Sequence, residues 1–449
     1  MRIVVVGAGK FGYSVANLLS KGQFDVVVVE SDENRRNIVK NTLDVLTILG
    51  NGCSEEVLSM PEIAQADVCV ACTDSDEVNM IVCFLAKEHG IRYTIAQIRS
   101  TDYDSHAQEL LHKEMKIDLA LNPERILARE LKNILETPAA LAINLFADGK
   151  ISLFEVKMLP SSAYVDKPLR EIHLPGGILI AMIFRNGVMI IPHGDDMLKA
   201  GDNVYFVGKS EAVSTLRGNF NSQYKKTERV LILGASRTVR FLLPILEELN
   251  IFVKIIDTDK EKCQQMIPLV NNGMVLCGDG TDFDFLKDEG ISDADVVLCL
   301  TDNDKLNLLF AMIAKHLGTK KTIVRVARSE YVGLMGEAGV DITLSARILS
   351  AGEVLKFIRR EVLISLSLLE GAQAEMMELK IPHVSPLVGK ALLEADLPRE
   401  CLVCAMVHDN EAFVPNGNTI LSAGDRMIIF AHSKVVMDIM ALFPEEFSR

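Results

Sequence analysis

The stretch Arg2-Ile-Val-Val-Val-Gly-Ala-Gly-Lys-Phe-Gly-Tyr13 joins a β-branched run to three glycines spaced as Gly-x-Gly-x-x-Gly. A helical pattern follows, and a second apolar run over 26–29 ends in the acid Glu30. Strand, glycine turn, helix, strand and acid in this order form the fingerprint of a dinucleotide-binding βαβ unit. The stretch therefore predicts an α/β fold built on a Rossmann-like, doubly wound parallel sheet.

Each residue type in this fingerprint has a physical reason. Gly7 allows a tight turn, Gly9 lets the backbone approach a pyrophosphate, and Gly12 lets the helix pack closely on the strand. The helix N-terminus offers free N–H groups and a positive dipole end to the phosphates. Glu30 can accept from ribose hydroxyls and would repel a 2′-phosphate, which favours NAD over NADP. The candidate cofactor-binding residues are Gly7, Ala8, Gly9, Lys10, Phe11, Gly12 and Glu30. The alternative is a Rossmann-like unit in which the glycines serve only the packing of helix and strand and no nucleotide binds.

Three further strands are predicted over 45–49, 66–73 and 93–98, with helices between them. Alternating strands and helices indicate a parallel sheet, whose ligand crevice lies at the carboxyl ends of the strands. The further candidate cofactor-binding residues expected at that edge are Asn51, Gly52, Thr73, Asp74 and Gln97.

The segment Thr73-Asp-Ser-Asp-Glu-Val-Asn79 has two compatible interpretations. In the first, Thr73 or Asp74 caps the following helix and Glu77 completes a capping box. In the second, the segment contacts the nucleotide, because it follows a strand beside the point where the strand order reverses.

The chain then repeats itself. A helix is predicted from Asn122-Pro123, and a β-rich module follows over about 147–213, with a polar linker at 218–228. The run Val230-Leu-Ile-Leu-Gly-Ala-Ser-Arg237 realigns with the start of the chain, and Pro192…Asp202 returns as Pro415…Asp425. We therefore expect parallel-sheet units at 1–121 and 228–344. Each is followed by a helix and a small β-rich α+β module, at 122–220 and 345–449.

The second glycine loop departs from the fingerprint. Ser236 replaces the second glycine, and Val239, which replaces the third, should push the helix away from the sheet. Nucleotide binding by this copy therefore stays open. Its candidate cofactor-binding residues are Gly234, Ser236, Arg237, Asp257, Asp279, Thr301 and Arg325.

Composition excludes several classes of protein. The formal net charge of −14 argues against a nucleic-acid partner. The longest apolar runs, such as 177–184 and 362–369, are far shorter than the ~20 residues of a membrane span. The glycine turn interrupts any signal-peptide core at the N-terminus. We therefore expect a soluble, cytoplasmic chain.

The nine cysteines give no close-spaced framework. Cys69 and Cys72, like Cys401 and Cys404, lie three apart in apolar strand-like runs, where alternation places them on opposite faces. Neither pair is expected to chelate a metal, and buried free thiols are predicted instead.

No catalytic residues are predicted. The nine histidines are scattered, and His193 in a Pro-His-Gly turn is expected to be solvated. A dehydrogenase normally follows its nucleotide-binding unit with a substantial substrate domain, whereas here a small β-rich module precedes a second such unit. A nucleotide site without a reaction partner favours a sensor over an enzyme.

These features together resemble the TrkA family, the peripheral cytoplasmic subunits of bacterial Trk potassium uptake systems. The resemblance covers essentially the whole chain. It rests on 4–12 with Glu30, the Ala-Asp-Val…Thr-Asp-x-Asp-x-x-Asn segments at 66–79 and 294–307, Ser385-Pro-Leu-Val-Gly-Lys390, and Gly424-Asp-Arg-Met-Ile-Ile-Phe430. It implies two tandem RCK (KTN) units, each with a Rossmann-like N-subdomain and a TrkA-C subdomain.

The resemblance implies the rest of the function. Such proteins bind NAD(H), or ATP and ADP, and form homo-oligomeric, tetrameric rings on a potassium-translocating membrane subunit of the TrkH or TrkG type. The chain would then sit on the inner face of the membrane and convert the bound nucleotide into a gate position. The helix after Asn122 resembles the family's crossover helix, which docks neighbouring units.

Two positions depart from the family pattern. Gln97 stands where an arginine is common, while the second copy keeps Arg325, and Asn51 stands where an acid is often found, while Asp279 keeps it. The two sites are therefore expected to differ in ligand or occupancy. The alternatives to a potassium-uptake regulator are an NAD-dependent oxidoreductase and a regulator of another cation transporter or antiporter.

Overall fold

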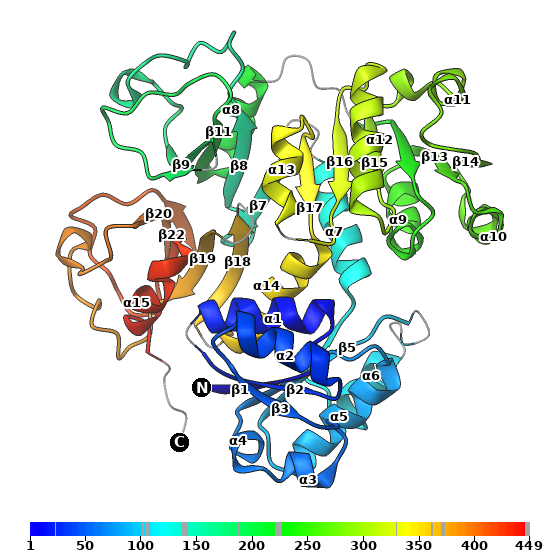
Figure 1. Ribbon diagram of the computed structural model, residues 1–449. Helices are drawn as coiled ribbons and strands as arrows, with labels where there is room; N and C mark the ends of the chain where they lie inside the picture. Colours follow the sequence, from blue (N-terminus) through cyan, green and yellow to red (C-terminus); the bar gives the residue numbers. More distant parts are fainter. Residues whose placement is uncertain are drawn as a thin grey trace. The chain divides into compact units, whose positions relative to one another are not determined.

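The computed structural model describes residues 1–22, 24–100, 103, 107–136, 142–186, 188–220, 227–328, 330–360, 362–369 and 373–444. Within these residues the chain forms two six-stranded parallel sheets and two five-stranded antiparallel sheets, alternating along the sequence (Figure 1). Residues 1–126 with 346–360 form one compact unit, and 127–345 with 361–449 form another. The predicted tandem α/β fold is confirmed. Of the predicted linker, 221–226 lie outside the described residues.

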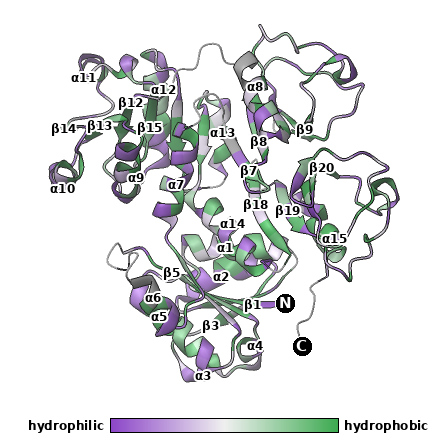
Figure 2. Cartoon of the chain, turned by 180° about the vertical axis from the view of Figure 1, so that it is seen from behind, coloured by the Kyte–Doolittle hydropathy of each residue, from purple (hydrophilic) through white to green (hydrophobic). Residues whose placement is uncertain are grey.

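The first parallel sheet has the strand order β3-β2-β1-β4-β5-β6, which is that of a doubly wound dinucleotide-binding fold. Its strands are β1 (Arg2–Val6), β2 (Asp25–Glu30), β3 (Leu46–Leu49), β4 (Val68–Ala71), β5 (Tyr93–Gln97) and β6 (Leu119–Leu121). Its helices are α1 (Lys10–Lys21), α2 (Glu33–Thr42), α3 (Glu55–Leu58), α4 (Pro61–Ala64), α5 (Asp76–Glu88) and α6 (Ala107–Lys113). The central strands are continuous apolar runs because helices cover both faces of the sheet, and they are coloured mainly hydrophobic in Figure 2.

A helix from the second half of the chain completes this unit. Helix α14 (Ala346–Ile358) packs on α1. Phe357 meets Tyr93 edge-on with ring centroids 6.0 Å apart, and the Arg359 guanidinium lies 5.7 Å from the centre of the Phe24 ring. The two halves of the chain therefore contribute to one core.

The second parallel sheet repeats the order as β14-β13-β12-β15-β16-β17. Its strands are β12 (Arg229–Leu233), β13 (Phe252–Asp257), β14 (Gly273–Cys277), β15 (Val296–Cys299), β16 (Thr322–Arg325) and β17 (Ile342–Leu344). Its helices are α9 (Arg237–Glu248), α10 (Lys260–Met266), α11 (Phe283–Asp288), α12 (Asp304–His316) and α13 (Tyr331–Glu337). Helix α7 (Pro123–Glu136) leads from the first sheet, and Asn122 caps it as predicted by accepting from Arg125 N at 3.0 Å. Lys132 of α7 pairs with Glu248 of α9 at 3.6 Å.

The antiparallel sheets have matching orders, β10-β9-β11-β8-β7 and β21-β20-β22-β19-β18. The first contains β7 (Ala142–Phe146), β8 (Ile151–Lys157), β9 (Ile178–Arg185), β10 (Val188–Ile190) and β11 (Asn203–Lys209), followed by α8 (Ser210–Phe220). The second contains β18 (Leu363–Leu369), β19 (Ala374–Lys380), β20 (Cys401–His408), β21 (Glu411–Phe413) and β22 (Arg426–His432), followed by α15 (Val436–Ala441).

The two antiparallel sheets share one hydrophobic core, in which Tyr205 and Met182 of the first join Phe430 of the second. Buried Glu378 lies at its edge, where its carboxylate accepts from Ala147 N at 3.0 Å and from Arg426 Nη1 at 2.9 Å. A buried carboxylate needs such partners, so this contact orients one module on the other.

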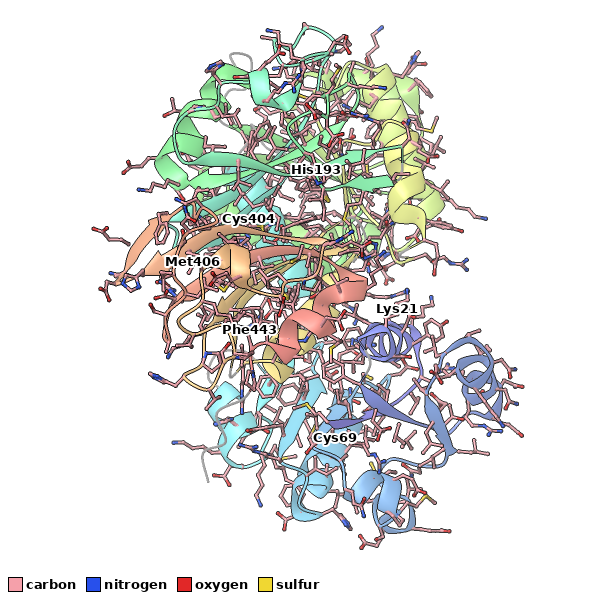
Figure 3. All side chains as sticks on the ribbon, turned by 90° about the vertical axis from the view of Figure 1, so that its left-hand side faces the viewer. Lys21, Cys69, His193, Cys404, Met406 and Phe443 are labelled. Carbon is pink, nitrogen blue, oxygen red and sulfur yellow. The ribbon has the colours of Figure 1, made fainter. Side chains whose placement is uncertain are left out.

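The structure adds elements that the sequence did not predict. Each parallel sheet gains a sixth strand, β6 or β17, preceded by a helix, α6 or α13. The first antiparallel sheet begins at Ala142 rather than at 147, because β7 pairs with β8. The predicted thiols are free, and Cys69, Cys72 and Cys404 are buried; Figure 3 places Cys69 in the first parallel sheet and Cys404 in the second antiparallel sheet. Cys401 is only partly buried, so the prediction of full burial was wrong there.

Candidate nucleotide site

The first glycine turn uses its three glycines differently. Gly7 has φ +97°, and a Cβ there would lie 2.9 Å from Cys72 O, while a Cβ on Gly12 would lie 1.9 Å from Gly7 O. The fold itself therefore requires glycine at both positions. Gly9 is different, since the nearest atom to a Cβ there would be Asp74 Oδ1 at 3.9 Å. The fold itself therefore leaves room for a side chain at position 9.

Glu30 holds this turn from the end of β2. Its Oε2 accepts from Ala8 N at 2.6 Å and its Oε1 accepts from Asp32 N at 2.9 Å, with 5% of the residue exposed. Asp257 repeats the arrangement, accepting from Ala235 N at 2.7 Å and from Asp259 N at 2.9 Å. The acid of the fingerprint thus fixes the loop in addition to facing the crevice, which the sequence argument did not anticipate.

The predicted N-cap of the helix after β4 was wrong. The N-cap of α5 is Ser75, which accepts from Val78 N at 3.2 Å, and not Thr73 or Asp74. Glu77 accepts from the Ser75 hydroxyl at 2.6 Å, so it forms no capping box. Asp76 accepts from Arg99 N and Ser100 N at 2.8 and 2.7 Å and joins α5 to the end of β5.

The second copy confirms that the cap lies further along the chain. Asn303 caps α12 by accepting from Lys305 N and Leu306 N, at the position that corresponds to Ser75. In both copies the first aspartate of the motif, Asp74 or Asp302, is therefore left free of the capping role.

A pocket of about 290 Å³ opens at the carboxyl ends of β1, β2 and β4. Seven predicted residues line it: Gly7, Gly9, Glu30, Asn51, Gly52, Thr73 and Asp74. Ala8, Lys10, Phe11 and Gly12 do not line it: Ala8 bonds to Glu30, Phe11 is buried, and Lys10 is exposed at the start of α1. The structure thus brings together seven of the twelve residues predicted at this edge of the first sheet.

Gln97 does not line the pocket, contrary to its expected place there. It is 3% exposed, and its carbonyl accepts from Asn79 Nδ2 at 2.9 Å. Its side-chain oxygen accepts from Arg99 at 3.3 Å. The end of β5 is turned into the protein because Asn79 and Asp76 tie it to α5.

Arg35 lines the pocket and was missed by the sequence argument. It lies in the first turn of α2, and its guanidinium is 3.5 Å from Asp74 Oδ2. Both side chains are more than half exposed. The sequence did offer one signal for Arg35: it follows closely after β2, whose carboxyl end reaches the crevice. A cation and an anion thus form an ion pair at the pocket wall.

The second copy gathers the corresponding residues with different chemistry. Gly234 has φ +106° and packs against Thr301, and Ser236 begins α9 with a buried hydroxyl that has no partner among the described residues. Val239 is fully buried in α9. Asp279 holds its own turn by accepting from Thr281 N and hydroxyl, and these bonds lower its pKa.

The clearest chemical difference between the two crevices is Arg325, which corresponds to Gln97. Its Nη1 donates to Asp302 Oδ1 at 2.5 Å and to Thr301 O at 3.1 Å. Burial would raise the pKa of Asp302, but the Arg325 bond and the charges of Lys262 and Arg237 outweigh it and lower that pKa. The corresponding Gln97 supplies no such charge, so Asp302 has an arginine partner from β16 that Asp74 lacks on β5.

Comparison with family models identifies the chain. TrkA-N domain models match 3–123 and 230–346, and TrkA-C domain models match 153–221 and 376–443. The chain belongs to the TrkA family. Its tandem arrangement of parallel and antiparallel sheets is that of two consecutive TrkA-N and TrkA-C pairs.

Full-length relatives agree with this assignment. The chain is 36% identical over 453 residues to the Trk system potassium uptake protein TrkA homolog 2 of Methanosarcina mazei, covering 99% of this chain and 100% of that one. It is 34% identical to the TrkA homolog of Archaeoglobus fulgidus, with coverage of 99% and 100%, and 30% identical to TrkA of Halomonas elongata, with coverage of 99% and 98%.

Solved structures share the fold. The crystal structure of the GsuK RCK domain aligns with a TM-score of 0.61 at 19% identity, covering 98% of this chain and 94% of that one. A GsuK channel bound to NAD aligns with a TM-score of 0.61 at 19% identity, covering 98% and 78%. In the part of the chain that the structure describes, no helix is long and apolar enough to cross a bilayer.

Proposed function

We propose that this chain is a nucleotide-sensing regulatory subunit that gates a membrane potassium uptake system. The observation that carries the proposal is the first-sheet pocket, with open space at Gly9, in a chain that matches Trk potassium uptake proteins from end to end. The chain acts as a sensor and not as an enzyme. Its expected division at 1–121, 122–220, 228–344 and 345–449 provides two parallel-sheet units, each followed by a module, and the proposed sensing site is in the first unit.

The proposed ligand is NAD(H), with ADP or ATP as the alternative. GsuK structures of the same fold are described as bound to NAD and to ADP. The α1 N-terminus at Gly9 would receive the phosphates, and Glu30, Asn51 and Asp74 would face ribose and base. Gly7 and Gly12 hold the first glycine loop in shape, because a Cβ at either position would meet backbone atoms.

The pocket suggests how binding would be transmitted. Its lining comes from the glycine turn, from Arg35 on α2, and from Thr73 and Asp74 between β4 and α5. A ligand that bridges these elements would favour one arrangement of them. Different nucleotides would gate differently only through different affinities for the two arrangements.

The proposed assembly is a tetrameric ring on the cytoplasmic face of the membrane, against a TrkH- or TrkG-like translocating subunit. The helices that occupy matching places in the two parallel sheets carry exposed apolar side chains: Ile81 and Leu110 on α5 and α6, and Leu309, Met312 and Leu334 on α12 and α13. Exposed apolar surface of this kind supports contact between copies. Light scattering should show a tetramer that Met312→Glu dissociates and that Val188→Glu, on an exposed edge strand, leaves intact.

Two alternatives are distinguishable. An NAD-dependent oxidoreductase would consume NADH with a substrate, and a regulator of another cation transporter or antiporter would leave potassium uptake unchanged. We expect no NADH turnover by the purified chain, and loss of nucleotide-dependent potassium uptake when it is deleted from cells.

The decisive binding experiment is calorimetric titration of the purified chain with NADH, NAD, ATP and ADP. Gly9→Val fills the open space in the first turn, and Ser236→Val is the matched change in the second. We expect Gly9→Val to abolish the tightest binding and Ser236→Val to retain it. Binding that survives Gly9→Val and is lost in Ser236→Val would contradict the assignment to the first sheet.

A further inference from the structure

Two cysteines lie together at one corner of the second parallel sheet. Helix α10, which carries Cys263, packs on β13 and β14 (Figure 1), and Cys277 is the last residue of β14, paired with Asp257. Cys263 Sγ donates to Asp257 O at 3.4 Å and to Leu276 O at 3.6 Å. Cys277 Sγ donates to Thr258 O at 3.7 Å. The two sulfurs therefore donate to the carbonyls of consecutive residues, Asp257 and Thr258.

The two thiols differ in access. Cys277 is exposed, whereas Cys263 is buried with 5% of its surface accessible. Burial raises the pKa of Cys263 to about 11, and the charge of Cys277, that of Asp257 and a hydrogen bond with Cys277 add to the rise. The thiols are thus neighbours at one corner of the sheet, one exposed to solvent and the other buried.

The first copy has no such pair. Arg36 occupies the fourth position of α2, as Cys263 does in α10, and Leu49 ends β3, as Cys277 ends β14. The thiol pair is therefore not a requirement of this α/β corner. It belongs to the second sheet alone, beside Asp257 and directly before the Gly278–Gly280 turn.

We propose that Cys263 and Cys277 form a reversible disulfide and make this corner a redox modification site. The oxidant is a hydroperoxide. The Cys277 thiolate attacks the peroxide oxygen, the O–O bond breaks to release an alcohol or water, and Cys277 becomes a sulfenic acid. Cys263 sulfur then attacks that sulfur and the hydroxyl leaves as water. Two thiols are oxidised by two electrons and one peroxide is reduced.

The bond would tie α10 to the end of β14. Asp257, which holds the second glycine loop through Ala235, and the turn that follows Cys277 are both next to it. Oxidation would thus stiffen the second crevice without touching the first. This inference concerns covalent chemistry and stands apart from the proposed nucleotide sensing.

The test is peptide mapping of the full chain after treatment with hydrogen peroxide and alkylation of the remaining thiols. We expect a linked Cys263–Cys277 peptide that dithiothreitol removes. In Cys263→Ala, the exposed Cys277 should instead be recovered as sulfenic acid or as an intermolecular disulfide. In Cys277→Ser, Cys263 should stay reduced, because it is buried. Circular dichroism checks that both variants fold.

Cys53 serves as the matched control, since it is partly exposed and its N–H donates to Asn51 in the corresponding turn of the first sheet. It should be oxidised only as a single thiol. Oxidation of Cys277 in the unmodified chain without a link to Cys263, or a link from Cys277 to any other cysteine of the same chain, would overturn the proposal. So would oxidation of Cys263 in Cys277→Ser.

Discussion

Asn79 Oδ1 accepts hydrogen bonds from both the backbone N–H and the hydroxyl of Thr73, at 2.7 and 2.8 Å. Its Nδ2 donates to Gln97 O at 2.9 Å, so one buried amide joins the carboxyl ends of β4 and β5. Asn307 makes the same bonds to Thr301 and Arg325 O. The motif shared by the two copies is therefore a structural clamp at the edge of the crevice.

Asn79→Leu should destabilise the first unit, because it keeps the branched shape of the side chain but strands the Thr73 N–H and the Gln97 carbonyl. Each buried unsatisfied group costs ~1–3 kcal/mol, so two of them predict a loss of about 2–6 kcal/mol. Denaturant unfolding followed by hydrogen exchange in β4 and β5 would measure it. Asn133→Ala, at an exposed position of α7, is the control, and equal effects from both changes would refute the clamp.

Gly9→Ala and Gly12→Ala should separate binding from folding. A Cβ at Gly9 projects toward the pocket at an ordinary backbone conformation, so we expect unchanged thermal unfolding and nucleotide affinity lower by about tenfold, or ~1.4 kcal/mol. A Cβ at Gly12 collides with Gly7 O and should cost about 3 kcal/mol. Thermal unfolding and calorimetry would measure both. Unaltered binding in a folded Gly9→Ala chain would contradict the ligand's place.

Arg35→Ala should weaken binding of the negatively charged nucleotides, because it removes a cation from the pocket wall. Since Arg35 is half exposed and paired with Asp74, we expect a loss of about tenfold or less that shrinks at high salt. Lys40→Ala removes the same charge from the far end of α2 and should leave affinity unchanged. Equal losses in the two variants would point to long-range charge instead of contact.

His408 and Asp425 give the second antiparallel module a pH dependence that the first lacks. His408 Nδ1 lies 2.7 Å from Asp425 Oδ1, where the first module has the Arg185–Asp202 pair with bonds at 2.7 Å. The hydrogen bond with Asp425, then the charges of Asp425 and Asp409, raise the pKa of His408. Its stabilising contribution is complete below the unfolded value of 6.5 and is lost as pH rises through the higher folded value.

As the pH rises from 6.5 to the raised folded pKa, the thermal midpoint of the unmodified chain should therefore decrease relative to that of the His408→Arg chain. The arginine reproduces the first module's permanent pair and should flatten that part of the profile. His408→Gln should lose the contribution at every pH. A profile of the same shape in the His408→Arg chain would show that another group titrates.

Much of the fold follows from local patterns. The glycine turn, Glu30 and the apolar runs predicted the parallel sheets, and the repeat at Val230 predicted their duplication, because those signals act within a few residues. The sixth strands escaped prediction because β6 and β17 are three residues long and are defined by their pairing with β5 and β16. Strands this short carry no periodicity.

The candidate site, like the fold, was predicted from the sequence only in part. Sequence alone determined which strand ends meet at the crevice and that Gly7, Gly9 and Glu30 lie there, since parallel order and glycine spacing impose it. Tertiary structure decided that Ser75 caps α5, that Gln97 turns inward, and that Arg35 faces Asp74. It also placed Cys263 beside Cys277. Each of these depends on side chains from separate elements meeting in space, and no spacing along one strand or helix encodes such a meeting.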